Sequence, residues 1–388
     1  MNRKRIGKIL WGINTEMMMN LAVKQEEEKP RTRCGYEPAE SIRAFEKALI
    51  ETGAIGTGRA LHFAADIVCS GGIDSFIRSI WDFSISHVGL ASPRIFVYLK
   101  KRIEEVQEML KRLPDEEAYK SEEFQVRIGE LVLVLKDAPS RTVIGWPKVG
   151  VETHTEGWIH AAAAAPETAV LRQVWRAEGD ASILRTVGAE MCKAITDGSI
   201  EKALFWIKWL FEEDAKVRKE VKGASISTYD RSLSGSKQKG GIAFFILALY
   251  AEIYKELAGK QLVRMHEEFK TLIDLWRSGD KHIQGGARKQ ILTILTQILC
   301  EVPRWKVPAA PTLIKDPVAM SQAIRQVPKF FREVIAYDPP SGMVALIKGF
   351  KTRGKVDSKV VAKTKKGDAA ELKLDAFDRA LEDYFARQ

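Results

Sequence analysis

The sequence contains few cysteines and no long apolar run. Its four cysteines, Cys34, Cys69, Cys192 and Cys300, are far apart, and no C-x-x-C pair occurs. This distribution indicates neither a disulfide framework nor a zinc site, so we expect buried thiols in a reducing intracellular compartment. No stretch approaches the eighteen or so apolar residues that a helix needs to cross a bilayer, which predicts a protein without a membrane span.

Motifs for catalysis and nucleotide binding are also missing. The nearest candidate for a phosphate-binding loop, residues 53–60, has glycines but lacks Gly-Lys-Ser/Thr, and we expect it to form a loop between helices. No H-E-x-x-H or G-x-S-x-G sequence occurs, and His154 and His160 have the wrong spacing for a metal pair on a helix. The sequence therefore predicts a non-enzymatic protein with no cofactor and no metal site.

Several side chains that could bind nucleic acid are predicted to be structural instead. His62 and His87 flank the Gly-Gly pair at 71–72 and are interpreted as core or capping residues. Trp206 and Trp209 lie beside Lys208, as the rings of a stacking platform for single-stranded nucleic acid would. We favour burial between packed helices for this pair, with the platform as the alternative.

Helical spacing of apolar residues is widespread, whereas alternation with period two is almost absent. Residues 94–113 show a helical face most clearly. Residues 124–135 are ambiguous, because the apolar run 131–135 fits a buried strand while Glu122 and Glu123 favour a helix. The prediction is an all-α protein of two helical lobes with flexible basic segments at both ends.

Composition divides the chain into five segments. They are an N-terminal arm and linker (1–38), a first helical lobe (39–140), a connecting region (141–166), a second helical lobe (167–340), and a basic linker with a C-terminal docking helix (341–388). The basic, amphipathic start of the first segment is interpreted as an arm that docks on a partner, and a mitochondrial presequence is the alternative.

One stretch has a pattern that can be compared with a known family. Residues 70–78 are Ser-Gly-Gly-Ile-Asp-Ser-Phe-Ile-Arg, and residues 88–93 are Val-Gly-Leu-Ala-Ser-Pro. The pattern predicts three helices joined by two tight turns. Gly89 is expected to end the middle helix in a conformation that other residues do not adopt, with Pro93 starting the next helix.

This pattern resembles the helical region that follows the ATPase core in clamp loaders and in Mgs-type replication-recombination proteins. The resemblance implies a role in DNA replication or repair, without the motor, since the ATPase motif is missing. The matching residues are Gly71, Gly72, Asp74, Ile77, Arg78, Gly89, Leu90, Ala91 and Pro93. Residues 203–210 and 288–301 resemble an uncharacterised all-helical family of giant nucleocytoplasmic DNA viruses, which implies a viral source and no activity.

The net charge of +10, from 61 basic and 51 acidic residues, is concentrated in one segment. Residues 348–366 carry eight basic side chains against a single acidic one, Asp357. Such a block stays flexible and attracts polyanions, so it is predicted to bind nucleic acid. Its basic residues are Lys348, Lys351, Arg353, Lys355, Lys359, Lys363, Lys365 and Lys366.

Two apolar features are predicted to dock on a protein partner. Trp305 stands between two basic residues and two prolines, in a segment expected to be extended and exposed. A C-terminal helix over residues 372–385 has an apolar face, for which packing on the chain's own body is the alternative. The docking residues of this helix are Leu374, Phe377, Leu381 and Phe385.

Together these features predict an accessory factor of DNA replication or repair that binds nucleic acid and protein partners. If the source is viral, its site of action is the viral factory or the nucleus. The alternative is a structural component of a virion or of its assembly that bridges neighbouring subunits. The sequence leaves homo-oligomer formation open.

Overall fold

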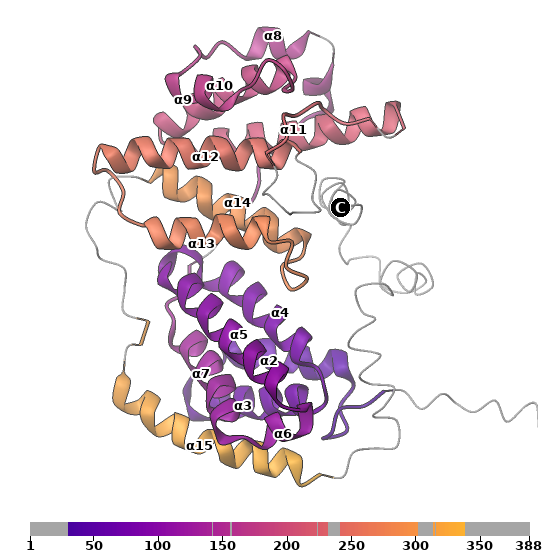
Figure 1. Ribbon diagram of the computed structural model, residues 1–388, viewed down its shortest axis with the longest axis vertical. Coiled ribbons are helices and arrows are strands. Elements are labelled where there is room, and N and C mark those ends of the chain that lie inside the picture. The colour runs from indigo at the N-terminus through magenta and orange to yellow at the C-terminus, as the bar shows by residue number, and fades with distance from the viewer. Residues whose placement is uncertain are drawn as a thin grey trace, which may run out of the picture.

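The computed structural model describes residues 30–141, 143–155, 157–222, 224–231, 241–301, 313–314 and 316–337. Within these ranges the chain forms fourteen α-helices and no strand, which confirms the all-α prediction. The helices pack as two lobes, one above the other in Figure 1. The basic end segments that were predicted to be flexible lie outside the described residues.

The lower lobe contains the first helices of the chain and also the last described helix. Its members are α2 (Pro38–Ile50), α3 (Gly53–Cys69), α4 (Ile73–Phe83), α5 (Arg94–Arg112), α6 (Asp115–Lys120), α7 (Glu122–Asp137) and α15 (Pro317–Ile335). The α2–α3 pair has the most extensive contact, and α15 packs against α3 and α7. In Figure 1, α15 runs along the bottom of this lobe.

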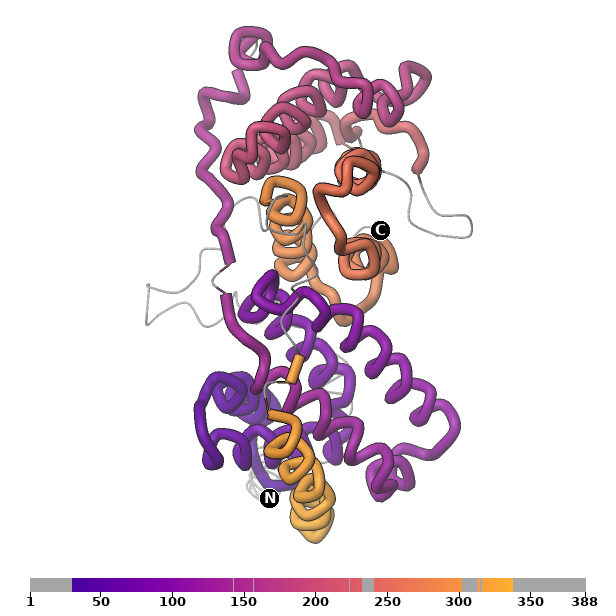
Figure 2. The backbone as a smooth tube through the Cα atoms, turned by 90° about the vertical axis from the view of Figure 1, so that its left-hand side faces the viewer, coloured from indigo at the N-terminus to yellow at the C-terminus, as the bar shows by residue number. Residues whose placement is uncertain are grey.

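The upper lobe contains the helices between these two parts of the chain. They are α8 (Trp158–Ala162), α9 (Ala169–Val174), α10 (Ser182–Thr196), α11 (Ile200–Glu220), α12 (Ile242–Gly259), α13 (His266–Arg277) and α14 (Gly285–Cys300). The connecting region is extended up to residue 150 and runs up one side of the molecule in Figure 2. Arg141 fixes it through an ion pair with Glu301, 2.7 Å between Nη2 and Oε1.

The ambiguous segment 124–135 belongs to a helix, α7, and not to a strand. Glu122 and Glu123 lie in its first turn, where negative charge complements the helix dipole. The apolar run 131–135 is buried throughout, because α2, α3, α5 and α15 all contact α7. A helix that is covered on most sides is apolar on most sides, and this explains why its sequence also fits a buried strand.

The expected loop at residues 53–60 was wrong, because these residues form the first two turns of α3. Their glycines serve packing. A β-carbon at Gly56 would lie 2.4 Å from the carbonyl oxygen of Glu51, so the tight connection from α2 requires glycine there. Gly53, with φ of +77°, starts the helix in the left-handed region.

The two predicted glycine turns are confirmed. Gly71, with φ of +80°, follows α3, and the backbone N–H of Gly72 donates to the carbonyl of Ile67 over 2.9 Å, as in a Schellman cap. After α4 the chain forms one π-helical turn, Ser84–Val88, which ends at Gly89 with φ of +48° and ψ of −130°. Pro93 directly precedes α5.

Helix α15 packs on the lower lobe, although its sequence position placed it with residues 167–340 in the second lobe. Its buried residues Met320, Val327, Phe331 and Val334 form a single apolar face. Periodicity predicts such a face but does not indicate which other helix it meets. The contact of this face with α3 and α7 makes the lower lobe discontinuous in sequence.

The closest approach of α15 to α7 depends on Gly129. A β-carbon at Gly129 would lie 2.3 Å from Cγ2 of Val327. We therefore predict that Gly129→Ala lowers the free energy of unfolding by about 1–3 kcal/mol through overpacking. Urea denaturation measures this change.

The matched control is Gly58→Ala, since Gly58 lies on α3 and also faces α15. A β-carbon at Gly58 would lie 3.8 Å from Cζ of Phe330, an ordinary contact. This change is expected to be neutral or to stabilise by up to about 1 kcal/mol through helix propensity. Equal denaturation midpoints for the two variants would show that α7 and α15 are not in close contact.

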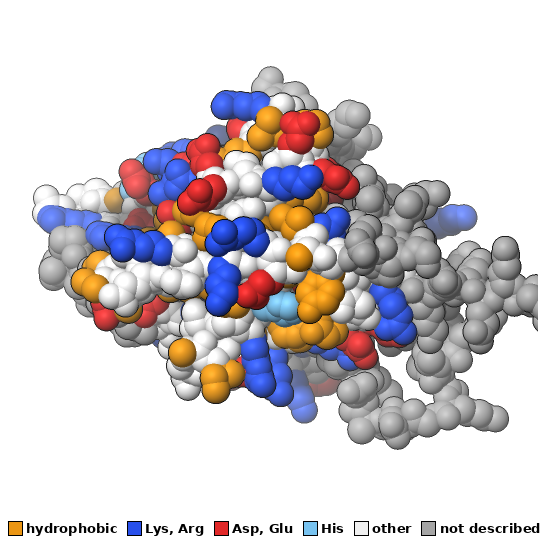
Figure 3. Space-filling view, turned by 90° about the horizontal axis from the view of Figure 1, so that it is seen from below, with side chains coloured by type: hydrophobic (Ala, Val, Ile, Leu, Met, Phe, Trp, Pro, Cys, Tyr) orange, Lys and Arg blue, Asp and Glu red, His pale blue; other side chains and the backbone are white. Residues whose placement is uncertain are grey.

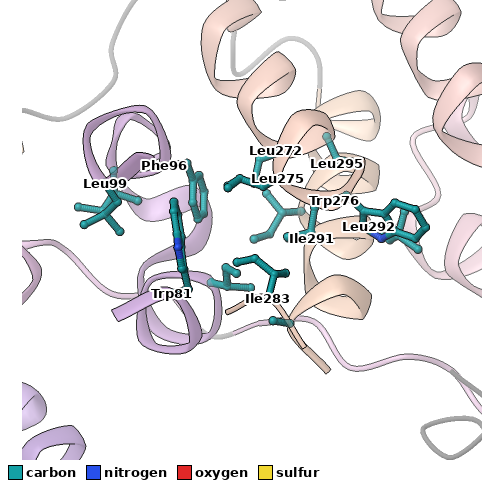
Figure 4. Close-up of a cluster of buried hydrophobic side chains, with 14 of the residues drawn as sticks. Trp81, Phe96, Leu99, Leu272, Leu275, Trp276, Ile283, Ile291, Leu292 and Leu295 are labelled. Carbon is teal, nitrogen blue, oxygen red and sulfur yellow. The ribbon is translucent and has the colours of Figure 1, made fainter. Parts of the chain in front are cut away.

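The two lobes share one apolar core. Trp81 and Phe96 of α4 and α5 are fully buried and face residues of α13 and α14 across the lobe junction (Figure 4). The upper-lobe members of this cluster are Leu272, Leu275, Trp276, Ile283, Ile291, Leu292 and Leu295. Because the cluster is continuous, we expect the lobes to unfold together.

A partly buried polar contact also joins the lobes. The Nε2 atom of His282, which precedes α14, lies 3.1 Å from Oδ1 of Asp74, in the first turn of α4. Its Nδ1 atom lies 2.7 Å from Oδ1 of Asp280, and Lys281 donates to Asp74 over 2.7 Å. Asp74, the aspartate that follows the Gly-Gly pair, therefore links α4 of the lower lobe to the segment before α14 in the upper lobe.

Candidate nucleic-acid interface

None of the predicted site residues lies in the described part of the chain. This applies to the basic residues Lys348, Lys351, Arg353, Lys355, Lys359, Lys363, Lys365 and Lys366, and to the docking residues Trp305, Leu374, Phe377, Leu381 and Phe385. The structure does describe the surface from which the basic segment continues. The last described residue is Tyr337, two residues after the end of α15, and the basic segment begins at Lys348.

The first described residues of the chain and the end of α15 meet at this surface. The guanidinium Nη1 of Arg33 donates to the carbonyl oxygen of Ile335, 3.4 Å away. Residues 1–29 and 338–388 are therefore attached to the same part of the lower lobe. We call this surface the lower face. It comprises Arg31, the turn 32–36, residues 62–63 of α3, the exposed side of α15, and Tyr337.

Asp66 fixes the turn at 32–36, although residues 1–38 were predicted to be an arm and linker. Its carboxylate is fully buried and accepts hydrogen bonds from the backbone N–H of Cys34, at 2.9 Å, and from the hydroxyl of Ser41, at 3.0 Å. A buried carboxylate needs such donors, so the turn and α3 stabilise each other. Burial raises the pKa of Cys34 to about 12, so this thiol is no nucleophile at neutral pH.

Aromatic rings gather at the turn. The Tyr36 ring lies 6.2 Å from that of His62 and 5.4 Å from that of Phe63, measured between centroids. Tyr36 is 38% exposed and Tyr337 is 55% exposed. Burial raises the pKa of the Tyr36 hydroxyl, and neighbouring groups, Tyr337 among them, raise it further. His62 is half-buried here and is not a core residue.

The exposed side of α15 carries a basic stripe. Arg325, Lys329 and Arg332 are four and three residues apart, so they project from one face of the helix, and all three are exposed. Glu333 is the one acidic residue of α15, and its carboxylate is 4.0 Å from Nζ of Lys329. Figure 3 shows this side of the molecule, where basic, acidic, hydrophobic and histidine side chains are interspersed.

The tryptophan pair of α11 is not a binding platform. Trp206 and Trp209 are 6% and 2% exposed, and Trp158 packs on both. His154 stacks on Trp209 with a centroid distance of 5.4 Å and an angle of 7°. The favoured interpretation, burial between packed helices, is therefore confirmed for these residues.

A second candidate surface is an open cleft of about 630 Å³ at the lobe junction. Arg94, at the start of α5, faces Arg264 and His266 of the upper lobe across it. Glu267 and Glu268 line the same cleft. Because both basic and acidic side chains line the cleft, its charge favours neither anionic nor cationic ligands.

Metal and membrane sites were sought in the described residues as well. Among them, no three His, Cys, Asp or Glu side chains are grouped so that they could hold a metal ion. No helix in these ranges combines the length and the apolar character needed to cross a bilayer.

Comparison with known proteins adds no relative. No family model matches the chain, and no curated protein or solved structure resembles it significantly. The arguments for function therefore come from its own residues.

Proposed function

We propose that this chain is a non-enzymatic DNA-binding protein that acts as an accessory factor in replication or repair. The observation that carries the proposal is the basic stripe of α15, which is followed after residues 336–347 by the basic segment 348–366. Phosphate contacts from lysine and arginine provide most of the affinity of proteins for nucleic acid. The N-terminal arm, with Arg3, Lys4 and Arg5, joins the lower lobe at the same face.

The role in replication or repair rests on the resemblance to the helical region of clamp loaders and Mgs-type proteins. In this chain both turns of that motif lie at the lobe junction, where Asp74 contacts His282 and the π-turn Ser84–Val88 contacts α14. We infer a scaffold role for the motif, with DNA bound at the lower face. Trp305 and the C-terminal helix are proposed to dock on protein partners, and a viral source would place the protein in the viral factory or the nucleus.

A charge-neutralised variant tests the proposal. The triple change Arg325→Gln, Lys329→Gln and Arg332→Gln removes the stripe while leaving the buried face of α15 intact. Three lost phosphate contacts are expected to weaken DNA binding roughly 100-fold near 0.1 M salt and to reduce the slope of log K against log salt by about 2.7. Fluorescence anisotropy of labelled DNA across a salt series measures both quantities.

A second triple variant serves as the control. Lys202, Lys219 and Lys222 are exposed residues in or just after α11, and their replacement by glutamine removes the same charge from the upper lobe. This variant should bind DNA almost as the native chain does. Equal losses in both variants would reject the lower face as the site. Absence of salt-dependent DNA binding in the native chain would favour the alternative, a structural protein that bridges neighbouring subunits.

A further inference from the structure

We propose that the lower face selects single-stranded DNA over duplex DNA, with Tyr36 as a ring on which a base stacks. This inference rests on the proposed function and names the class of DNA that the same face binds. Its basis is the aromatic group at the turn, which the basic stripe alone does not explain.

Exposed aromatic side chains are rare in this structure. Among the described residues, the exposed ones are Tyr36, Tyr229 and Tyr337, and two of these three belong to the lower face. Trp81, Trp276 and the other large rings fill the interior of the lobes. An exposed ring costs favourable burial, so two such rings beside a basic stripe indicate a surface built to contact a ligand.

The rings at the turn meet at steep angles and are not stacked parallel on one another. Tyr36 meets His62 at 89° and Phe63 at 59°, and His62 meets Phe63 at 74°. Neither ring is stacked parallel on Tyr36, and the Tyr36 side chain is 38% exposed, so part of its ring remains available for a base.

The backbone that carries the Tyr36 ring is fixed before any ligand binds. The backbone N–H of Tyr36 donates to the Thr32 hydroxyl over 3.0 Å, and the N–H of Thr32 donates to the Tyr36 carbonyl over 2.8 Å. Gly35 has a φ of +87°, a left-handed conformation that glycine adopts without strain and that this closed turn requires. A ring held in place loses little conformational entropy when a base stacks on it.

Cationic side chains flank the ring. Arg31 is exposed, and its Nη1 donates to the carbonyl of Gly35, 2.9 Å away, so its charge is held beside the turn. Arg33 links the turn to the end of α15, on which Arg332 begins the basic stripe from that end.

Rings interleaved with positive charge match a single strand and not a duplex. In a duplex the bases are already stacked on one another, so a surface ring gains nothing without breaking base pairs. A single strand presents its bases to the ring while its phosphates follow the basic groups. The duplex can use the stripe alone.

The experiment measures anisotropy of a labelled oligodeoxythymidine of about 16 nucleotides, and of a duplex of equal length, with the full-length chain. The single strand is expected to bind at least about tenfold tighter at equal salt. Tyr36→Ala should weaken single-strand binding about 5- to 100-fold and leave duplex binding unchanged. Tyr36→Phe, which keeps the ring, should retain the native affinity within about twofold.

Tyr229→Ala is the matched control, since Tyr229 is 45% exposed but lies in the upper lobe beyond α11. It should alter neither affinity. Unchanged duplex binding also shows that Tyr36→Ala still folds. Equal affinity for the two DNAs, equal effects of Tyr36→Ala and Tyr229→Ala, or tighter binding of an oligouridine of the same length would overturn the inference. Failure of both DNAs to bind would instead reject the proposed function.

Discussion

Trp81→Ala is expected to lower the free energy of unfolding by about 3–5 kcal/mol, because it removes a fully buried ring and leaves a cavity. Trp81 is 1% exposed and belongs to the cluster that joins α4 and α5 to α13 and α14. The loss therefore affects both lobes. Circular dichroism and tryptophan fluorescence should show one shared transition at lower urea concentration.

Trp81→Phe is the control for this change. It keeps an aromatic ring in the cluster and removes the indole N–H, which is buried without a hydrogen-bond partner among the described residues. Its cost should stay below about 1.5 kcal/mol, since the lost volume is smaller and no donor is left unsatisfied. Two separate transitions in Trp81→Ala, with one lobe as stable as before, would contradict a shared core.

His282→Gln is expected to lower stability by about 2–3 kcal/mol near pH 6, because hydrogen bonds between charged groups are lost at a buried site. Burial alone lowers the pKa of His282, but hydrogen bonds to Asp280 and Asp74 outweigh it and raise the pKa above the usual 6.5. The same contact, chiefly the hydrogen bond from His282, holds the pKa of Asp74 well below its usual range. The imidazolium can donate to both carboxylates at once.

The direction of the pH dependence follows from these shifts. A raised histidine pKa contributes stability that is fully present below the unfolded value of about 6.5 and is lost as pH rises through the folded value. The difference between native chain and variant should therefore shrink as pH rises above about 6.5. His160→Gln, at an exposed histidine, should change stability by less than about 0.5 kcal/mol. A pH-independent difference would show that His282 does not titrate in this contact.

The sequence predicted local structure well, because helical periodicity and turn chemistry are properties of neighbouring residues. The three-helix pattern around Gly71 and Gly89 followed from apolar spacing, Asp74 and the glycine and proline positions. The sequence left residues 124–135 open between strand and helix, and the structure shows the helix that Glu122 and Glu123 favour.

Contacts between distant residues could not be predicted in this way. Asp66 holds Cys34 from 32 positions away, and Asp74 meets His282 from 208 positions away. The lower face depends on such pairs. Tyr36 was predicted to lie in a linker, but the contact of Asp66 with Cys34 fixes it in a turn on the folded lobe. The basic segment 348–366 and the docking residues stay predictions, because they lie outside the described residues.

The late position of α15 in the sequence affects how the chain folds during synthesis. Its contact surfaces on α3 and α7 are complete once the ribosome has passed Asp137, but α15 begins only at Pro317. At about 5–20 residues per second this interval lasts roughly 10 to 40 s. During that time the apolar sides of α3 and α7 have no cover from α15, so apolar surface stays exposed on the nascent lower lobe.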